Sequence, residues 1–258
     1  MGLPFTQGRA AIVAAHPDDE TVGLGGSFSR IAAPLLIHLT DGAPRDMVDA
    51  AANGFSKRED YAAARRQELV EALQAGGVIQ ASMVALGCVD QEASLRMVEL
   101  ARDLARLFRC HGVETVFTHA YEGGHPDHDA AAFAVNAACQ SLDTAHRPQI
   151  VEFTSYHARS GEFEAGSFLP EGDAPETEIY LDTDALRRKT SMLACYRTQQ
   201  ATLQYFKSNR VEKFRPAPEY DFSQPARSGR LFYERVAGGM TADRWLSLAA
   251  TARKKLGL

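Results

Sequence analysis

The chain has 258 residues, is 45% hydrophobic and carries a net charge of -5, an ordinary composition for a soluble protein with one substantial core. This balance, without any long Lys/Arg block, argues against nucleic acid and anionic membrane surfaces as partners. No apolar run approaches the ~18 residues of a membrane span, the N-terminus lacks the pattern of a signal peptide, and the four cysteines form no C-x-x-C pair. We therefore expect a cytoplasmic protein with no membrane span and with free thiols.

Short apolar runs alternate with amphipathic segments over the first part of the chain. We expect strands at residues 9–15, 34–39, 82–86, 114–118 and 149–155, and helices at residues 27–33, 57–75, 95–110 and 129–140. This alternation is typical of an α/β fold, and it predicts a Rossmann-like, mostly parallel sheet flanked by helices.

Beyond residue 157 the pattern is looser. We expect one domain over residues 1–258, with a Rossmann-like core at 1–157 and a smaller, irregular C-terminal elaboration at 158–258 that borders the substrate cleft. The expected elements there are a loop or lid at 160–175, strands at 178–181 and 231–235, an irregular stretch at 215–229, and helices at 184–206 and 242–256. Asp182 or Thr183 is the expected N-cap of the first of these helices. The long loop at 42–56 is a second candidate lid.

Residues 11–20, AIVAAHPDDE, end the first predicted strand with one imidazole and three carboxylates: His16, Asp18, Asp19 and Glu20. Adjacent acids repel one another, and they lose solvation when the loop that carries them is enclosed. A bound cation offsets both effects. The stretch therefore predicts one half of a metal site.

The fourth predicted strand ends in a segment of the same design. Residues 119–129 read HAYEGGHPDHD and bring His125, Asp127 and His128 to a strand end. In the doubly wound strand order 3-2-1-4-5, strands one and four are neighbours, and the loops after them flank one crevice at the carboxyl edge of the sheet. We expect the two segments to meet there, although about a hundred residues separate them.

The residue types suggest a division of roles. Imidazole nitrogen and carboxylate oxygen are zinc ligands, and a catalytic zinc site keeps one position for water. His16 and Asp19 can point to one ion across a proline turn, and a histidine of the second segment completes three ligands. Asp18 is then free to accept a proton from water, and a spare histidine can donate to an oxyanion or to a leaving amine.

AHPDDE after the first strand and GGHPDH after the fourth closely resemble the paired motifs of the PIG-L/LmbE superfamily of zinc-dependent N-deacetylases. Members of this superfamily remove acetyl groups from N-acetylglucosamine conjugates, so the resemblance implies hydrolysis of a small-molecule amino-sugar substrate. It covers roughly residues 8–155. It implies a Zn2+ cofactor with three ligands: His16, Asp19 and His128. It also implies that Asp18 is the general base and that His125 stabilises the tetrahedral intermediate.

Supporting roles follow for further residues. By the same resemblance, Asp127 orients a histidine, and we interpret Glu20 as a supporting charge beside the site. The RRQEL segment resembles a helix of the family that places Arg65 near the substrate, with Arg66 as a competing alignment. Asp90, after LGCV, resembles the acid that contacts sugar hydroxyls.

Several alternatives stay open at this point. The same residues suit a larger amide, such as a sugar–thiol conjugate, and a divalent ion other than zinc. A non-catalytic sugar- or metal-binding module and a homo-oligomer are further alternatives. Outside the motifs, Arg197 and Gln199 are candidates for the cleft wall, and His38 is expected in the core. The remaining histidines expected at the surface or in loops are His111, His146 and His157.

Overall fold

The computed structural model describes residues 8–78, 80–170, 174–207, 209–235 and 239–258. Its centre is a seven-stranded sheet in the order β3-β2-β1-β4-β5-β9-β8. The parallel strands are β1 (Arg9–Ala14), β2 (Leu35–Thr40), β3 (Ser82–Cys88), β4 (Val113–His119) and β5 (Gln149–Phe153). Beyond β5 the antiparallel strands are β9 (Val211–Pro216) and β8 (Thr177–Tyr180). The expected α/β fold with a mostly parallel sheet is confirmed.

Helices cover both faces of this sheet. The α-helices are α1 (Asp19–Leu24), α2 (Val48–Ala52), α3 (Arg58–Ala75), α4 (Met97–His111), α5 (Pro126–Gln140), α6 (Thr183–Cys195), α7 (Gln200–Leu203) and α8 (Ala242–Leu256). The short 3-10 helices are η1 (Phe28–Arg30), η2 (Ala93–Arg96), η3 (Thr144–His146), η4 (Arg197–Gln199) and η5 (Phe232–Arg235). Among the described helices, none is both long enough and apolar enough to cross a membrane.

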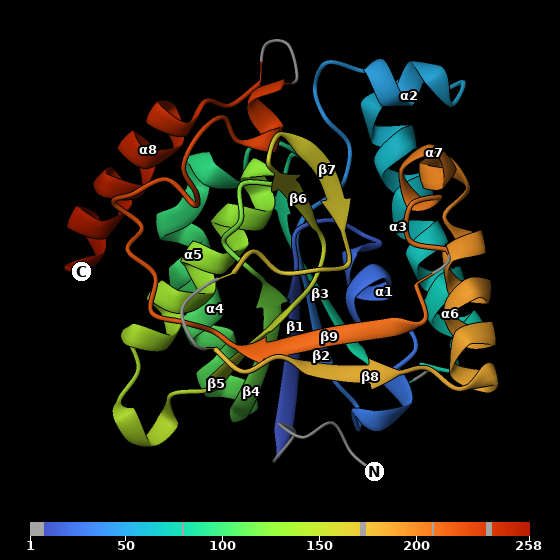
Figure 1. Ribbon diagram of the computed structural model, residues 1–258, viewed down its shortest axis with the longest axis horizontal. Coiled ribbons are helices and arrows are strands. Elements are labelled where there is room, and N and C mark those ends of the chain that lie inside the picture. The colour runs from blue at the N-terminus through green and yellow to red at the C-terminus, as the bar shows by residue number, and fades with distance from the viewer. Residues whose placement is uncertain (1–7, 79, 171–173, 208, 236–238) are drawn as a thin grey trace.

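The two faces of β1 pack into different cores, because successive side chains of a strand point to opposite sides of the sheet. Ala11 and Val13 share a core with α4, α5 and α8. Ala10 and Ile12 share the other core with α1, α3 and α6. Figure 1 shows these two helical layers on opposite sides of the strands. Burial on both faces explains why the central strands read as continuous apolar runs.

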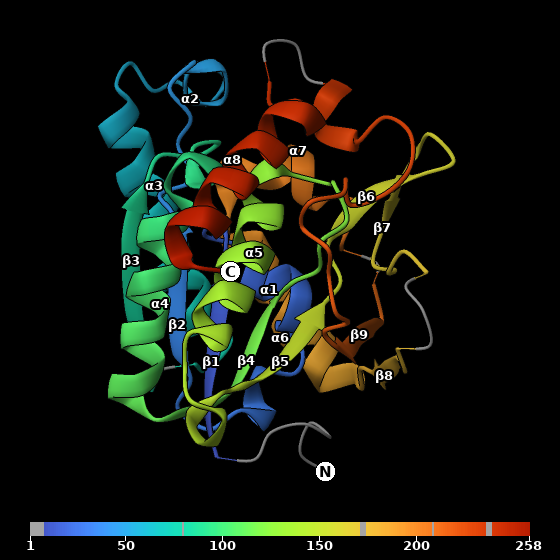
Figure 2. The same cartoon turned by 90° about the vertical axis from the view of Figure 1, so that its left-hand side faces the viewer.

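The sheet reverses its order at β1, which lies between β2 and β4. Val13 is aligned with Ile37 of β2, and Ala11 is aligned with Val116 of β4. The expected order 3-2-1-4-5 is therefore confirmed, and Figure 2 shows these strands side by side. The carboxyl ends of β1 and β4 flank the switch point, which is where open α/β sheets bind ligands.

The acids of both motifs lie at helix N-termini, so each motif runs into the first turn of a helix. The helix expected at residues 27–33 was wrong, because α1 begins earlier, at Asp19, and the later region holds only η1. Asp19 and Glu20 occupy the first turn of α1, where carboxylates interact favourably with the helix N-terminus. Similarly, α5 begins at Pro126 and not at residue 129, since proline fits the first position of a helix.

The C-terminal part departs most from expectation. The expected loop or lid at 160–175 contains a strand, β7 (Glu162–Ala165), which forms a separate antiparallel hairpin with β6 (Tyr156–Arg159) just before it. The segment expected as a strand at 231–235 is the 3-10 helix η5, and the helix expected at 184–206 breaks after α6 into η4 and α7. Short apolar runs do not distinguish these states by periodicity alone. Residues 171–173 of the expected lid lie outside the described residues.

Other C-terminal expectations are confirmed. The closing helix α8 has the expected bounds. Asp182 is the N-cap of α6, and its side chain accepts a hydrogen bond from the Ala185 N–H at 2.8 Å.

Candidate metal centre

Asp19 connects the ends of β1 and β4. Its Oδ2 lies 3.1 Å from His16 Nδ1, and its Oδ1 lies 3.2 Å from His128 Nε2. His16 comes from the loop after β1, Asp19 from the first turn of α1 and His128 from the first turn of α5, and all three are buried. Two ligand atoms of a tetrahedral zinc ion with bonds of about 2.0–2.1 Å lie about 3.3 Å apart. Each histidine is separated from Asp19 by about this distance, and the two histidines contact different oxygens of the Asp19 carboxylate.

More ligand atoms surround this group. Among the described residues, three overlapping clusters of metal-binding side chains occur: His16, His125 and His128; His16, Asp90, His125 and Asp127; and Asp19, His119 and His128. His16 Nε2 forms an ion pair with Asp90 Oδ1 at 3.1 Å and lies 3.4 Å from Asp127 Oδ2. Imidazole nitrogen and carboxylate oxygen atoms gathered in this way are ligands of divalent cations. The residues present therefore fit a metal ion.

The protonation states of the buried histidines and aspartates in this group depend on one another. Burial and the neighbouring His119 lower the pKa of His128 to about 4. Burial alone would raise the pKa of Asp19, but the adjacent histidines, His128 first, lower it well below its usual range. Burial likewise opposes protonation of His16, yet the carboxylates of Asp90 and Asp19 raise its pKa well above its usual value. A metal ion takes the place of such a proton, because the ligands must be deprotonated to bind it.

Asp18 lies between the two ligands of the first motif at a strained backbone position. Its φ is 148°, and its backbone N–H donates to Glu20 Oε2 at 3.1 Å. Its Oδ2 accepts a hydrogen bond from Arg65 Nη2 at 3.1 Å. Burial raises the pKa of Asp18 to about 8, and Arg65 opposes this shift. The side chain lines the cavity beside the ligand group, which is the position that the predicted proton acceptor requires.

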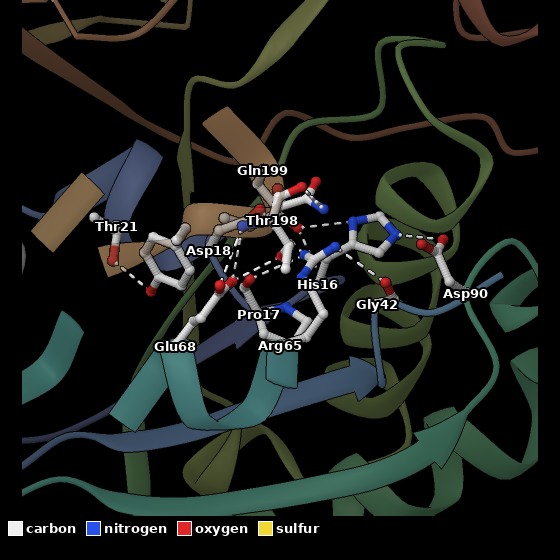
Figure 3. Close-up of polar contacts among 12 residues, drawn as sticks. His16, Pro17, Asp18, Thr21, Gly42, Arg65, Glu68, Asp90, Thr198 and Gln199 are labelled. Carbon is white, nitrogen blue, oxygen red and sulfur yellow. Dashed lines mark hydrogen bonds and ion pairs between the residues drawn. The ribbon is translucent and has the colours of Figure 1, made fainter. Parts of the chain in front are cut away.

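Arg65 ties α3 to the loops after β1 and β2. Nη1 donates to Gly42 O and Nη2 donates to Pro17 O, both at 3.0 Å. Figure 3 shows the guanidinium reaching between these loops beside Asp18. Arg65 is buried, whereas Arg66 is exposed, so of the two competing alignments it is Arg65 that lies at the site.

His125 caps the N-terminus of α5. Its Nδ1 accepts a hydrogen bond from the Asp127 N–H at 3.2 Å. Burial and the neighbouring His16 lower the pKa of His125 to about 4, so the ring is neutral at pH 7. In a neutral imidazole with Nδ1 as the acceptor, Nε2 bears the proton. His125 therefore presents an N–H donor into the cavity that it lines.

Glu20 and Asp127 bind neighbouring segments through hydrogen bonds to their carboxylates. Glu20 Oε1 accepts from the Tyr196 hydroxyl at 2.6 Å, and Oε2 lies 3.0 Å from Nε2 of His38, a buried residue as expected. The Asp127 carboxylate accepts two backbone hydrogen bonds from the loop after β3, at 2.6 and 3.0 Å, and lies 3.4 Å from His16 Nε2. Both acids are fully buried beside the ligand group, and their supporting roles stay predictions.

Two residues with no predicted role also belong to the site. The His119 ring stacks on the His128 ring at 4.0 Å and 12°, and His119 Nε2 accepts a hydrogen bond from the Ala15 N–H at 3.1 Å. Tyr156, after β5, lies 5.3 Å from the His128 ring. The position of His119 directly before the second motif was the available signal, whereas Tyr156 lies outside both motifs. His157, expected at the surface or in a loop, is buried, because the β6–β7 hairpin turns it inward.

A cavity of about 490 Å3 opens over the ligand group. Besides the ligands and the residues described above, its wall includes Asp46, Asp49, Asp90, Gln199, Thr202 and Phe206. Gln199 thus lines the cleft as expected. Arg197 is directed elsewhere and donates to Glu71 Oε2 at 2.7 Å. The volume and the mixed polar lining suit a small polar ligand.

Together, the fold and the site define a class of α/β proteins that gather histidine and aspartate side chains at the switch point of a parallel sheet. The family described as PIG-L: GlcNAc-PI de-N-acetylase matches residues 11–139, a segment that contains both motifs. The chain therefore belongs to the PIG-L family. The resemblance stated from the two motifs is confirmed.

Solved structures of deacetylases share the fold. A40926 pseudoaglycone deacetylase superimposes with a TM-score of 0.63 at 20% identity, over 83% of this chain and 98% of that chain. A zinc-inhibited form of teicoplanin deacetylase superimposes with a TM-score of 0.60 at 15% identity, over 83% of this chain and 99% of that chain. N,N'-diacetylchitobiose deacetylase from Pyrococcus horikoshii superimposes with a TM-score of 0.59 at 18% identity, over 81% of this chain and 84% of that chain.

The same fold also occurs in a protein named for a different reaction. 4-Carboxy-2-hydroxymuconate hydratase from Pseudomonas putida KT2440 gives a TM-score of 0.54 at 16% identity, over 83% of this chain and 98% of that chain. No curated protein sequence matches the chain. At these identities the likeness shows the fold, so the reaction has to be argued from the site.

Proposed function

We propose that the protein removes an N-acetyl group from an amino-sugar conjugate of the GlcNAc type, with a zinc ion held by His16, Asp19 and His128. One observation carries the proposal: Asp19 contacts a histidine from each motif at the switch point of the sheet. Membership of a de-N-acetylase family and the shared fold of three deacetylases support it. Three protein ligands leave a position for water, as catalytic zinc sites do.

The residues around the ligands have complementary tasks. Zinc bound in this site supplies a Lewis acid for the acetyl carbonyl and lowers the pKa of water. Arg65 opposes the effect of burial on the pKa of Asp18 and favours its ionised form, which accepts the proton of the attacking water. His125 donates its Nε2–H to the developing oxyanion. Breaking the C–N bond requires a proton on the leaving amine. Asp18 delivers the proton that it took from water, either directly or through His125, and acetate and a free amine result.

The rest of the cavity wall suits a sugar. Asp90, Asp49 and Gln199 offer oxygen acceptors, which are the partners that sugar hydroxyls need. Gln199 belongs to the C-terminal elaboration, and we therefore treat residues 158–258 as part of one functional domain with the core. Cys88 and Cys139 are buried and all four cysteines are free, as a reducing cytoplasm favours.

Product analysis tests this proposal. The zinc-loaded protein is incubated with N-acetylglucosamine glycosides and with sugar–thiol amides, and acetate and free amine are measured separately. Equal amounts of acetate and amine from the N-acetyl glycosides support the proposal. Amine without acetate, formed from the larger amides alone, would show that the scissile amide is a different one. No release from either class would overturn the proposed hydrolysis.

A further inference from the structure

A second cavity, of about 470 Å3, adjoins the cavity over the ligand group. The residues that line both cavities are Asp46, Asp90, Gln91, His125 and Tyr156. The described lining of the second cavity contains none of the three predicted ligands. We call it the outer chamber. A substrate seated over the ligands that extends into the outer chamber passes these five residues.

Aromatic side chains form one wall of the outer chamber and continue to the surface. Tyr156 and Phe232 line the chamber, and their ring centroids lie 5.7 Å apart. Phe163 of β7 lies 5.5 Å from Phe232 and 5.7 Å from Tyr156. Tyr205 lies 4.9 Å from Phe163. We call these four residues the aromatic wall. It begins at the reaction site, because Tyr156 also contacts the His128 ring.

Much of this apolar surface is open to solvent. Phe163 is 37% exposed and Tyr205 is 56% exposed, and Leu95, which also lines the outer chamber, is 47% exposed. The β6–β7 hairpin that carries Phe163 pairs with no other strand among the described residues. Its aromatic contacts, together with hydrogen bonds that Arg227 and Arg235 donate to its backbone carbonyls, hold it beside the chamber. Exposed apolar area gathered beside a cleft marks a ligand-binding surface.

Charges at the chamber favour a ligand without a phosphate. The guanidinium of Arg45 is engaged by Glu92, with Nε donating to Oε1 at 2.5 Å. The carboxylates of Asp46 and Asp90 lie on the boundary with the first cavity. Only Arg244 remains as a cation of the described lining without a paired acid at the chamber. Anionic headgroups would therefore meet more negative than positive charge.

We propose that the outer chamber binds an aromatic aglycone carried on the amine side of the scissile amide. The inference rests on the proposed function, in which the acyl group is an acetyl group. The single methyl of an acetyl group cannot fill a chamber of about 470 Å3, so a group that extends past His125 into the chamber belongs to the amine side of the amide. Ring stacking on the aromatic wall and a chamber of this size suit one or two rings better than a long alkyl chain.

A matched set of glycosides tests the inference. The substrates are 4-nitrophenyl and methyl N-acetyl-β-glucosaminide, with N-hexanoylglucosamine as a probe for acyl-chain binding. Binding of the corresponding deacetylated 4-nitrophenyl and methyl glucosaminides is measured by calorimetry, which needs no turnover. We expect the 4-nitrophenyl compounds to be favoured about tenfold, both in kcat/KM and in Kd.

Variants of the aromatic wall locate the effect. Phe232→Ala is expected to reduce the preference for the 4-nitrophenyl compounds by about three- to tenfold and to leave the methyl compounds unchanged. Phe163→Ala removes a ring that supports Phe232 and Tyr156 from outside the chamber lining, so it is expected to reduce the same preference by a smaller factor. Phe163 is partly exposed at a hairpin, so its replacement is expected to preserve folding. Tyr180→Ala, at an aromatic side chain of β8 that is 71% exposed, is the matched control and is expected to change neither value.

The outcomes separate this inference from the proposed function. Equal binding and turnover of the 4-nitrophenyl and methyl compounds would overturn the inference while leaving deacetylation intact. A preference for N-hexanoylglucosamine that Phe232→Ala removes would assign the chamber to the acyl chain and would also overturn it. Absence of acetate release would contradict the proposed function, whereas a calorimetric preference for the 4-nitrophenyl glucosaminide that needs Phe163 would still support an aromatic subsite.

Discussion

Arg65 and Asp18 form a buried hydrogen-bonded ion pair, in which Nη2 donates to Oδ2 at 3.1 Å, and Arg65 also donates to two backbone carbonyls of the loops that carry the site. We expect Arg65→Met to lower kcat at least tenfold and to reduce the free energy of unfolding by about 3 kcal/mol, because it removes the hydrogen-bond donor from Asp18 and from two backbone carbonyls in a buried position. Arg66→Met is the matched control, since Arg66 is the exposed neighbour on the same helix. Rates and urea unfolding are compared side by side, and equal effects of the two substitutions would contradict the role given to Arg65.

Asp18 is assigned to proton transfer and not to metal binding. Asp18→Asn keeps the shape of the side chain but removes the acceptor, so we expect kcat to fall by about 10²–10⁴. Zinc content, measured by atomic emission, is expected to stay at the wild-type value. Asp60→Asn, at an exposed position in the first turn of α3, serves as the control. Loss of the metal in Asp18→Asn would make Asp18 a ligand and would revise the site.

His119 is expected to orient the ligand His128. The two rings stack at 4.0 Å, and His119 Nε2 is engaged by the Ala15 N–H, so His119 acts on the site through its neighbours. We expect His119→Asn to weaken zinc binding by about 10–100-fold, as loss of a residue that supports ligands typically does. Competition with a chromophoric chelator gives the zinc Kd of the folded variant. An unchanged zinc Kd would show that His119 does not support the ligand and only fills space. His111→Asn, at an exposed histidine, is the control for non-specific zinc binding.

Glu122 makes stability depend on pH. Burial raises the pKa of Glu122 to about 8, against the opposing effect of Arg215, whose Nη2 lies 3.6 Å away. The carboxylates of Glu152 and Asp129 also raise this pKa. Because the folded pKa lies above the unfolded value of about 4.3, the folded state binds a proton that the unfolded state has released. The contribution of Glu122 to stability is therefore full below about pH 4 and is lost as pH rises toward 8.

Urea unfolding of the metal-free protein between pH 5 and 8 measures this effect. Glu122→Gln keeps an acceptor for the backbone N–H of Leu169 but removes the titration, so its stability is expected to fall less steeply with pH than that of the wild type. The difference between the two slopes is expected not to exceed about 1.4 kcal/mol per pH unit. Parallel curves for the wild type and the variant would rule out the shifted carboxyl, and Glu162→Gln, at an exposed residue of β7, is the control.

Much of the fold and of the ligand group follows from local sequence. The central strands are recognisable because burial on both faces makes them continuously apolar, and the strand order then brings two distant motifs together at one switch point. The starts of α1 and α5 are harder to predict, because residues chosen for metal chemistry also occupy the first helical turns.

The rest of the site depends on contacts that no local pattern encodes. Tyr156 and Gln199 reach the cleft, and Phe163 packs behind Tyr156, through the packing of short hairpins and broken helices of the C-terminal part. Their side chains have no characteristic spacing relative to the motifs. Which of Arg65 and Arg66 faces the site likewise depends on the orientation of α3, since adjacent residues on a helix point about 100° apart.

Metal-dependent acetate release tests the central claim most directly. The protein is stripped with a chelator, zinc is returned in substoichiometric steps, and acetate released from an N-acetylglucosamine glycoside is measured at each step. We predict that the rate is negligible without metal, rises in proportion to zinc up to one ion per chain, and is not restored in Asp19→Ala. Undiminished acetate release from the stripped protein, or full restoration in Asp19→Ala, would contradict a zinc-dependent deacetylase built on His16, Asp19 and His128.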